Sequence, residues 1–410
     1  MIVISNFKQK GSKEMPSFEK KLTAFLEKNI IFIILFVGIV LSLVARISSF
    51  GFISDDMRGF LVGWFGQIEQ LGKIHALDTQ VGNYSVAYQT LISIMTYIPV
   101  DPVIQYKVLS VIFDYSLAAA AGLIVYELKD KNKFLGVLAS LIVMYSPLVI
   151  INSALWGQCD SIYSSFALWA LYFFIRKKYP VTFIMYGLAC AFKLQAVFLL
   201  PFLLFAYLRK KDFSLLYFLI IPAVMEIVCI PAMIMGRGFK AAFSVYFYQT
   251  ESCDKMYFNY PSVWSLFSDL KDVYRSIDYI SSLKIAAFIL AFVVLMMIMA
   301  FLVIKDVKID SVNTFLLSFV FVFTCVLFLP GMHERYGFLY EIIGIILIFV
   351  IPKTLWPLIV ITALSCMTYG ISLFGNIAVT PLMGIANILS YAVYLFFVFN
   401  RVLKTNGAES

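Results

Sequence analysis

Long apolar runs are the feature that most constrains what this chain can fold into. Runs of about 17 to 25 mostly apolar residues, the length that spans a bilayer as a helix, recur along nearly all of its 410 residues. Backbone N–H and C=O groups inside lipid must pair within their own segment, so such runs predict helices. Only 14% of the residues are charged, against about 25% in a soluble domain. The sequence therefore predicts an all-α polytopic membrane protein.

These runs predict about twelve transmembrane helices. The predicted spans are residues 29–48, 104–127, 134–151, 161–175, 181–193, 196–208, 213–235, 283–304, 311–330, 337–352, 355–374 and 378–400. The fifth and sixth are short and lack a polar loop between them, so we expect a broken pair that turns near Lys193. Two stretches between the first and second spans repeat apolar residues at helical spacing, and we expect interfacial helices there.

Lysine and arginine cluster in the short connections on one side of these spans. The clusters are residues 8–28, 129–133, 176–178, 209–211 and 305–308, followed by Lys353, Arg401 and Lys404. By the positive-inside rule this side faces the cytoplasm, so the net charge of +8 is mostly a topology signal. The sequence predicts a multi-pass protein of the plasma (cytoplasmic) membrane, or of the endoplasmic reticulum in a eukaryote, with both termini cytoplasmic and the long loops outside.

The predicted topology divides the chain into five parts. Residues 1–28 form a cytoplasmic basic arm without the small-residue cleavage site of a secretory signal. Residues 29–235 form the module expected to be catalytic, with a first outer loop at 49–102. A second long outer loop covers 236–282, a C-terminal transmembrane module covers 283–400, and a cytoplasmic tail covers 401–410.

The cysteines and histidines show no metal-binding spacing. The sequence therefore predicts no obligatory cofactor and indicates no metal, with a divalent ion left open. Cys159 and Cys253 both fall on the predicted outer side. Either a disulfide or two separate thiols fits this placement, and separate thiols are the interpretation that we favour.

Ionisable residues from four separate outer turns fall at one level of the predicted bundle. They are Asp55 and Asp56 after the first span, Asp160 before the fourth, Lys193 at the break of the short pair, and His333, Glu334 and Arg335 before the tenth. A charge inside the bilayer costs about 2.5 to 3.5 kcal/mol on insertion scales. Several charges at one level therefore predict a shared hydrated cavity.

The residue types of this predicted cavity suit the transfer of a phosphate-linked group. The guanidinium of Arg335 offers a planar fork that matches phosphate oxygens, and Lys193 adds a second cation. A nearby carboxylate can take the proton from a hydroxyl nucleophile, which is general-base catalysis. In a membrane enzyme this combination predicts sugar transfer from a polyprenyl-phosphate donor.

Six short motifs also give the chain a family resemblance. In order they are "SDDMRGFLVGW" (54–64), "NYSVAY" (83–88), "KVLSVIFD" (107–114), "LWGQCDS" (155–161), "FKLQA" (192–196) and "MHERY" (332–336). On these motifs the chain resembles the GT-C superfamily of polytopic membrane glycosyltransferases. Within it, the chain is similar to bacterial relatives of the second mannosyltransferase family of glycosylphosphatidylinositol anchor assembly. It departs from that pattern at Gly63 and at residues 85–87, where the family usually has prolines.

The resemblance implies roles for individual residues. The acid followed by Phe-Leu and Trp fits Asp56 better than Asp55, so Asp56 would be the general base, and Asp160 would hold the acceptor or sugar. The implied donor-phosphate contacts are Lys193, Arg335, His333 and Arg58, and the implied substrate contacts are Trp156, Gln158, Asn83, Tyr84, Glu334 and Tyr336. The implied donor is a monophosphate-linked sugar, possible identities including mannose, and the acceptor a glycan, lipid-linked or cell-wall polymer. One-step displacement would invert the anomeric carbon.

Each of these residues also has a purely structural interpretation. Asp55 or Asp56 could cap the helix that follows, and Asp160 could begin the next helix. Lys193 could extend toward the interface. Residues 333–335 could form an ordinary interfacial salt-bridge turn.

Other polar residues lie inside the predicted spans. Lys107 and Asp114 are seven residues apart and share a helix face, which favours a structural polar stripe. Asp114, Glu226 and Glu341 fit hydrogen bonding between helices better than catalysis.

Two other functions fit parts of the pattern. A lipid or solute transporter or flippase would line its path with the same charges, but transporters tend to show repeats and helices interrupted near the midplane. A glycan ligase or polymerase that uses diphosphate-linked donors is expected to carry more arginine in a large outer loop than Arg237 and Arg275. The polar groups gather at one face and the long loops on one side, so we predict an enzyme, a hexosyltransferase, with no nucleic-acid partner.

Overall fold

The computed structural model describes residues 16–251, 255–267, 277–375 and 378–407. Six of its helices are long and apolar enough to cross a bilayer: α1 (Ser17–Ser48), α4 (Pro102–Leu128), α13 (Ile277–Ile304), α14 (Ser311–Phe328), α16 (Leu355–Phe374) and α17 (Pro381–Gly407). A seventh candidate is α5 (Lys133–Met144) with the segment Pro147–Leu155, which bends by 47°. The prediction of an all-α polytopic membrane protein is confirmed.

Shorter elements complete the bundle. The apolar ones are α3 (Val86–Met95), α7 (Asp160–Ile175), α8 (Tyr179–Phe192), η5 (Leu215–Leu219) with α10 (Ile220–Val228), and α15 (Phe338–Val350). The others are η1 (Met57–Leu61), α2 (Val62–Gln70), η2 (Lys73–Asp78), α6 (Pro147–Ile150), η3 (Ile151–Leu155), η4 (Leu194–Leu199), α9 (Leu200–Lys210), α11 (Ile230–Ile234), α12 (Ala241–Glu251), η6 (Val263–Phe267) and η7 (Pro352–Thr354). Several predicted spans coincide with these short helices, so the number of about twelve stays a prediction.

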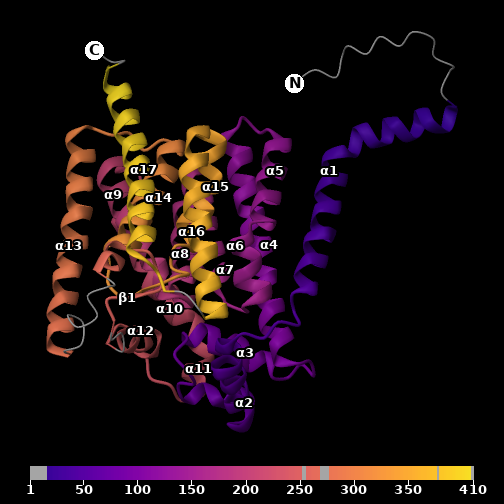
Figure 1. Cartoon of the computed structure of the whole chain (residues 1–410). Helices are drawn as coiled ribbons and strands as arrows, with labels where there is room; N and C mark the ends of the chain where they lie inside the picture. The colour runs from indigo at the N-terminus through magenta and orange to yellow at the C-terminus, as the bar shows by residue number, and fades with distance from the viewer. Residues whose placement is uncertain (1–15, 252–254, 268–276, 376–377, 408–410) are drawn as a thin grey trace.

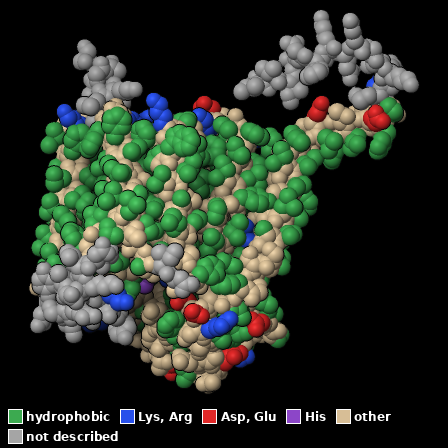
Figure 2. Space-filling view, in the orientation of Figure 1, with side chains coloured by type: hydrophobic (Ala, Val, Ile, Leu, Met, Phe, Trp, Pro, Cys, Tyr) green, Lys and Arg blue, Asp and Glu red, His purple; other side chains and the backbone are tan. Residues whose placement is uncertain are grey.

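The long helices run side by side, and the remaining elements gather unequally at their two ends (Figure 1). We call the end that carries the start of α1 and the last turn of α17 the terminal end. The opposite end, which we call the loop end, carries α2, α3, α11 and α12. Figure 2 shows hydrophobic side chains covering the bundle between the two ends, with charged side chains of both signs at either end.

The most deeply buried helices lie in the second half of the chain. Nearly every described side chain of α14 and α15 is buried, and the rings of Phe323 and Tyr340 stack across the two helices with centroids 4.3 Å apart. By contrast α1 exposes most of its side chains and packs against α5. A glycine allows this approach, because a Cβ on Gly38 would lie 2.3 Å from a methyl carbon of Leu141. The hydroxyl of Tyr145 also donates to the Gly38 carbonyl at 2.8 Å.

The predicted break near Lys193 is confirmed. Helix α8 ends at Phe192, Lys193 is extended with φ −152° and ψ 135°, and η4 then leads into α9. The segment between α1 and α4 contains α2 and α3, so both stretches predicted to be helical there are helices. Their location at a membrane interface stays a prediction.

Two short strands tie distant parts of the chain together. Strands β1 (Tyr257–Phe258) and β2 (Met332–His333) pair in parallel, with Tyr257 opposite Met332. The amide of Gly331 also donates to the carbonyl of Met256 at 2.8 Å. These bonds attach the segment before α13 to the turn between α14 and α15, which carries the "MHERY" motif.

Candidate active site

A tight turn between η3 and α7 forms the centre of the candidate site. Gly157 in this turn has a φ of +78°, the left-handed region that glycine adopts without a steric cost. A Cβ at Gly157 would also lie 2.2 Å from the methyl carbon of Met57, so another residue would push η1 away. The "LWGQCDS" motif therefore brings Trp156 and Gln158 against the segment that carries Asp56.

Asp56 is held by two neutral donors. The indole Nε1 of Trp156 donates to its Oδ2 at 3.0 Å, and the Nε2 of Gln158 donates to the same oxygen at 3.3 Å. Asp55 is exposed. The expected cap role of these acids belongs to another residue, since the Oγ of Ser54 accepts the amide of Met57 at 3.2 Å. Asp55 and Asp56, between which the sequence did not decide, thus have different environments in the structure.

Asp160, by contrast, is held by cations. Its side chain is fully buried, and its Oδ1 forms an ion pair with the Nζ of Lys193. Its Oδ2 lies 3.6 Å from Nη1 of Arg335 and accepts a hydrogen bond of 3.0 Å from Asn152. The side chain of Lys193 therefore points to Asp160. It does not extend toward a membrane interface, which was its structural alternative.

Arg335 joins the two acids through Gln158. Its Nη1 donates to Oε1 of Gln158, whose amide nitrogen contacts Asp56, and its Nε donates to Oε1 of Glu334 at 3.2 Å. The guanidinium lies 5.0 Å from the ring centre of Trp156, within cation–π range. Burial lowers the pKa of Arg335, but the carboxylates of Asp160 and Glu334 outweigh it and hold that pKa well above its usual range. Arg335 is therefore a fixed positive charge.

Glu334 beside it is buried, and burial raises its pKa although Arg335 opposes that shift. The structural alternative for residues 333–335 was an ordinary interfacial salt-bridge turn. Here the pair is instead withdrawn from solvent, with exposed fractions of 13% for Arg335 and 4% for Glu334.

Two aromatic residues of the predicted set line the same cluster. The hydroxyl of Tyr84 donates to Oε1 of Gln158 at 3.1 Å. The ring of Tyr336 lies 5.9 Å from the Nζ of Lys193. Asn152 and Tyr369 also reach the site, Asn152 through Asp160 and Tyr369 through ring contact with Trp156 at 5.4 Å. Sequence analysis missed both, although an asparagine in the apolar run "LVIINSAL" was a usable signal.

His333 sits at the edge of the cluster. Its ring stacks on Phe258 with centroids 4.5 Å apart and lies 5.2 Å from the ring of Tyr336. Burial, together with the positive charges of Arg335 and Lys193, lowers the pKa of His333 to about 3. The imidazole is therefore neutral near neutral pH. It can contribute a hydrogen bond to a phosphate but not the positive charge that its predicted role suggested.

Two predicted contacts do not join the cluster. Arg58 is exposed on η1, and within the described part of the chain no hydrogen bond or ion pair connects it to the other site residues. Asn83 is also exposed, and its recorded contact is made by its backbone carbonyl, which accepts from Gln249. Their predicted roles therefore stay predictions, and neither role gains support from the geometry.

Cys159 lies in the same turn, buried and with a free thiol. Its proposed partner Cys253 lies outside the described residues. Among the residues that the structure describes, no group of three or more His, Cys, Asp or Glu side chains is arranged to hold a metal ion.

The polar residues inside the spans mostly have the structural contacts that were predicted. Asp114 is bonded between helices, and Glu341 of α15 accepts from Ser365 of α16 at 2.6 Å. The prediction is wrong for Glu226, because neither carboxylate oxygen has a hydrogen-bond partner among the described residues. Both oxygens are buried, so the carboxyl group of Glu226 is withdrawn from solvent without a donor among the described residues.

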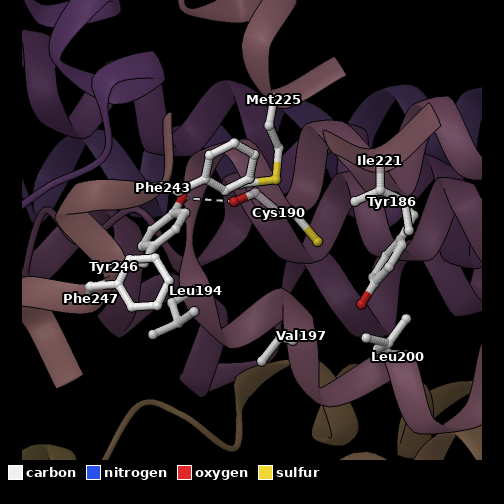
Figure 3. Close-up of a pocket in the computed structure, with 10 residues that line it drawn as sticks. All are labelled: Tyr186, Cys190, Leu194, Val197, Leu200, Ile221, Met225, Phe243, Tyr246 and Phe247. Atoms are coloured by element: carbon white, nitrogen blue, oxygen red, sulfur yellow. Dashed lines mark hydrogen bonds between the residues drawn. The ribbon is translucent and has the colours of Figure 1, made fainter. Parts of the chain in front are cut away.

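An apolar cavity of about 350 Å³ lies between the end of α8 and its neighbouring helices (Figure 3). Cys190 and Leu194, on either side of Lys193 in sequence, both line it. Apolar and aromatic side chains from α8, η4, α10 and α12 form the rest of its wall. The hydroxyl of Tyr246, whose ring lines the cavity, donates to the carbonyl of Cys190 at 2.7 Å, the bond dashed in Figure 3. This bond attaches α12 to the end of α8.

Comparison with known families gives one match. A family model described as glycosyltransferase family 87 matches residues 83–330, more than half of the 410-residue chain. The matched range includes Tyr84, the turn with Trp156 to Asp160, and Lys193, and it lies between Asp56 and Arg335. No curated protein matches the chain.

Proposed function

The chain belongs to glycosyltransferase family 87, a GT-C type family of membrane glycosyltransferases, and from this premise we propose that it transfers one sugar from a polyprenyl-phosphate donor to a hydroxyl group of an acceptor. The sugar is a hexose such as mannose. The acceptor is a glycan, lipid-linked or cell-wall polymer. Family membership makes the chain a membrane glycosyltransferase, in agreement with the GT-C resemblance of its motifs, while donor, sugar and acceptor are the proposal.

The observation that carries the proposal is the unequal environment of two acids around one glutamine. Asp56 accepts hydrogen bonds from the uncharged donors Trp156 and Gln158, so it is oriented without being neutralised. Asp160 is paired with Lys193 and Arg335. Two carboxylates whose environments differ in this way suit two different roles. Asp56 is the general base, and Asp160 holds the two cations in position.

The two cations suit the leaving group. Arg335 provides a planar fork for phosphate oxygens, and its contact with the Trp156 ring restricts the guanidinium. Lys193, at the break between α8 and η4, is a second positive charge that Asp160 holds in place. Positive groups that are already oriented stabilise a developing phosphate charge without reorganising during the reaction. The donor phosphate would compete with Asp160 for both cations.

The apolar cavity supports a donor with a hydrocarbon chain. Leu194, the residue after Lys193, lines it together with side chains such as Val197 and Met225 (Figure 3). Val197 is 39% exposed and Phe247 69% exposed, so the cavity has residues on the surface of the bundle. A polyprenyl chain could enter there from lipid while its phosphate reaches Lys193. The first isoprene units would then occupy the cavity.

The proposed reaction is a direct displacement. The carboxylate of Asp56 takes the proton of the acceptor hydroxyl while the acceptor oxygen forms a bond to the anomeric carbon of the sugar. The bond between that carbon and the donor phosphate oxygen breaks, and both of its electrons leave with the polyprenyl phosphate. Arg335 and Lys193 balance the resulting charge. One displacement inverts the anomeric configuration.

The location of the lysine and arginine clusters supports an orientation. Arg209, Lys305 and Arg401 belong to elements that end at the terminal end, so the positive-inside rule favours that end as cytoplasmic. The candidate active site would then face the outside of the cytoplasmic membrane. Polyprenyl-phosphate sugars would reach it within the outer leaflet.

The experiment that tests this function supplies donor and acceptor separately. Purified full-length protein in proteoliposomes receives a panel of polyprenyl-phosphate hexoses, beginning with mannose, together with a membrane extract as acceptor. Mass spectrometry should find an acceptor that has gained one hexose, with the opposite anomeric configuration. Uptake or flipping of the donor without any transfer would contradict the proposal and support a transporter.

A further inference from the structure

We propose that Asp114 is a positioning residue that, together with Arg46, holds the two segments carrying Asp56 and Asp160 in their working arrangement. The proposal rests on the function proposed above for these two acids. Asp114 lies near the middle of α4, and Arg46 lies two residues before the end of α1. The Nε of Arg46 is 3.0 Å from Oδ2 of Asp114, and both side chains are completely buried. Neither residue contacts the site directly.

The remaining partners of Asp114 are neighbours of site residues. The hydroxyl of Ser153 donates to Oδ2 of Asp114 and also to the carbonyl of Val149. Ser153 lies in η3, three residues before Trp156. The hydroxyl of Ser161 donates to the other carboxylate oxygen, and Ser161 directly follows Asp160. One carboxylate therefore holds both ends of the turn that carries Trp156, Gln158 and Asp160.

Arg46 connects this turn to the segment that carries Asp56. Its Nη2 donates to the carbonyl of Met144 at 2.9 Å, at the bend between α5 and the η3 region, and its Nη1 contacts Ser42. Helix α1 ends two residues after Arg46, and the chain continues directly to Asp56. The position of Arg46 therefore determines where that segment begins.

Lys107 extends the same contact along α4. It lies seven residues before Asp114, on the same helix face, and is completely buried. Its Nζ donates to the carbonyls of Phe50 at 3.0 Å and Ser49 at 3.3 Å, and it also contacts the carbonyl of Phe52. These carbonyls follow the end of α1 and precede Asp56. One face of α4 thus holds both the segment of Asp56 and the turn of Asp160.

Stability alone is a weak explanation for this arrangement. Replacing a buried ion pair with apolar residues of similar volume often leaves stability unchanged or increases it. A purely structural pair could therefore be replaced without loss. What an apolar pair cannot reproduce is the directional bonding of Asp114 to Ser153 and Ser161, each beside a residue of the site. The geometry of these bonds points to orientation of the site as their role.

The test removes both charges together. The double variant Arg46→Met with Asp114→Leu leaves neither member of this pair as an unpaired buried charge. Its control is Arg176→Met with Glu127→Leu, which also removes an ion pair made by α4. Glu127 lies in the last turn of α4 and Arg176 directly follows α7, so this pair is far from the turn that carries Asp160. A further variant, Ser153→Ala with Ser161→Ala, keeps the ion pair and removes only the two directional bonds. It answers the question if the first variant fails to fold.

Two measurements are made on variants whose thermal stability matches the parent. The first is kcat and KM for the donor in the transfer assay. The second needs no substrate: the chain has five tryptophans, and fluorine NMR of fluorotryptophan-labelled protein, with the Trp156→Phe variant used to identify its signal, reports on the indole that contacts Asp56. A misplacement of about 1 Å can cost about 100-fold in rate. We expect kcat to fall at least about tenfold, KM to change little, and the Trp156 signal to shift or broaden.

The control pair should keep the parent kcat and the parent Trp156 signal. A stable Arg46→Met, Asp114→Leu variant, or the serine variant in its place, that retains both the parent signal and the parent kcat would overturn the proposal. If no hexose donor supports transfer even by the parent protein, the proposed function fails. The Trp156 signal then decides by itself whether Asp114 positions the turn: an unchanged signal rejects the role, and a displaced signal supports it.

Discussion

The two ends of this bundle both carry ion pairs, but they differ in how far those pairs are removed from water. At the terminal end, Arg209 pairs with Asp306, which is 78% exposed, and Arg401 pairs with Asp310, which is 49% exposed. At the loop end, Asp160 is completely buried, and its partners Lys193 and Arg335 are only 12% and 13% exposed. Exposed pairs contribute about 0 to 1 kcal/mol each, whereas buried charges carry a large desolvation cost.

This difference separates the charges that we interpret as a topology signal from those of the candidate site. Pairs at the terminal end join a helix end to a nearby connection, as Arg209 of α9 joins Asp306 and Arg401 of α17 joins Asp310. At the loop end one cluster joins residues from the first loop, the η3–α7 turn, the α8 break and the turn before α15. Burying this many charges has a large desolvation cost, and clusters of such charges are typical of functional sites. The predictions below test whether function follows this division.

The largest effect is expected from the proposed base. Asp56→Asn keeps the size of the side chain and removes its ability to take a proton, so the initial rate of sugar transfer should fall by about 100- to 10,000-fold. Asp55→Asn is the matched control because Asp55 is the exposed neighbour. It should transfer at close to the parent rate. Substantial turnover by a folded Asp56→Asn protein would remove the central residue of the mechanism.

The next effect compares one arginine from each end. Arg335→Gln should lower kcat by about 100- to 1,000-fold, because the developing phosphate charge loses its oriented partner. Arg209→Gln at the terminal end removes an arginine whose partner Asp306 is exposed, and should change the rate by no more than about twofold. Initial rates and protein levels are measured for both variants. Equal losses of transfer rate in the two variants would show that the buried arginine is no more important for transfer than the arginine at the terminal end.

A smaller effect is expected at the apolar cavity. Val197→Trp should fill part of the cavity and displace about two methylene groups of the donor chain, which raises the donor KM by about tenfold. Ile184→Trp is the control, because Ile184 is also 39% exposed and lies on α8 outside the cavity lining. A donor with a shortened chain should be affected less. An unchanged KM for the long-chain donor would show that its hydrocarbon chain does not occupy this cavity.

The smallest effect concerns pH and stability. Because the folded protein holds the pKa of His333 at about 3, against about 6.5 for a free imidazole, the unfolded chain binds more protons between these values. The contribution to stability is present above about pH 6.5 and is lost as the pH falls toward 3. Between pH 7 and 5 the Tm should therefore decrease, and His333→Phe, which keeps an aromatic ring on Phe258, should decrease less.

The control for this prediction is the other histidine of the chain. His75 is exposed at the loop end, so His75→Phe should leave the pH dependence of Tm as in the parent. A parent protein and His333→Phe variant with the same slope would show that His333 does not titrate in the way that its burial requires.

The sequence predicted the members of the cluster better than their partners. Asp56, Asp160, Lys193 and Arg335 could be chosen because a charge in an apolar chain is costly wherever it lies. Their pairing could not be predicted, because contacting side chains lie far apart in the chain: Gln158 and Arg335, for example, are separated by 177 positions. Only the folded bundle shows that Asp160 holds the cations and that Asp56 does not.

Arg46 is a residue whose role the sequence did not indicate. It lies near the end of an apolar span, where the sequence resembles an ordinary boundary residue, and it was not singled out. The structure buries it completely because α4 supplies Asp114 and the α5 bend supplies a free carbonyl. Local sequence carries no sign of either partner. The same holds for Asp55, whose expected cap role is taken by Ser54 one position earlier.

The sequence by itself determined that this chain is helical, spans a membrane several times and carries costly charges at a few turns. Apolar length and charge are local properties, and the free energy of placing a segment in lipid depends on them. Tertiary structure alone decided which acid is neutralised by cations and which is left to accept neutral hydrogen bonds. That distinction depends on contacts between distant segments, and the free energy of a buried charge is determined by its nearest partner rather than by its neighbours in sequence.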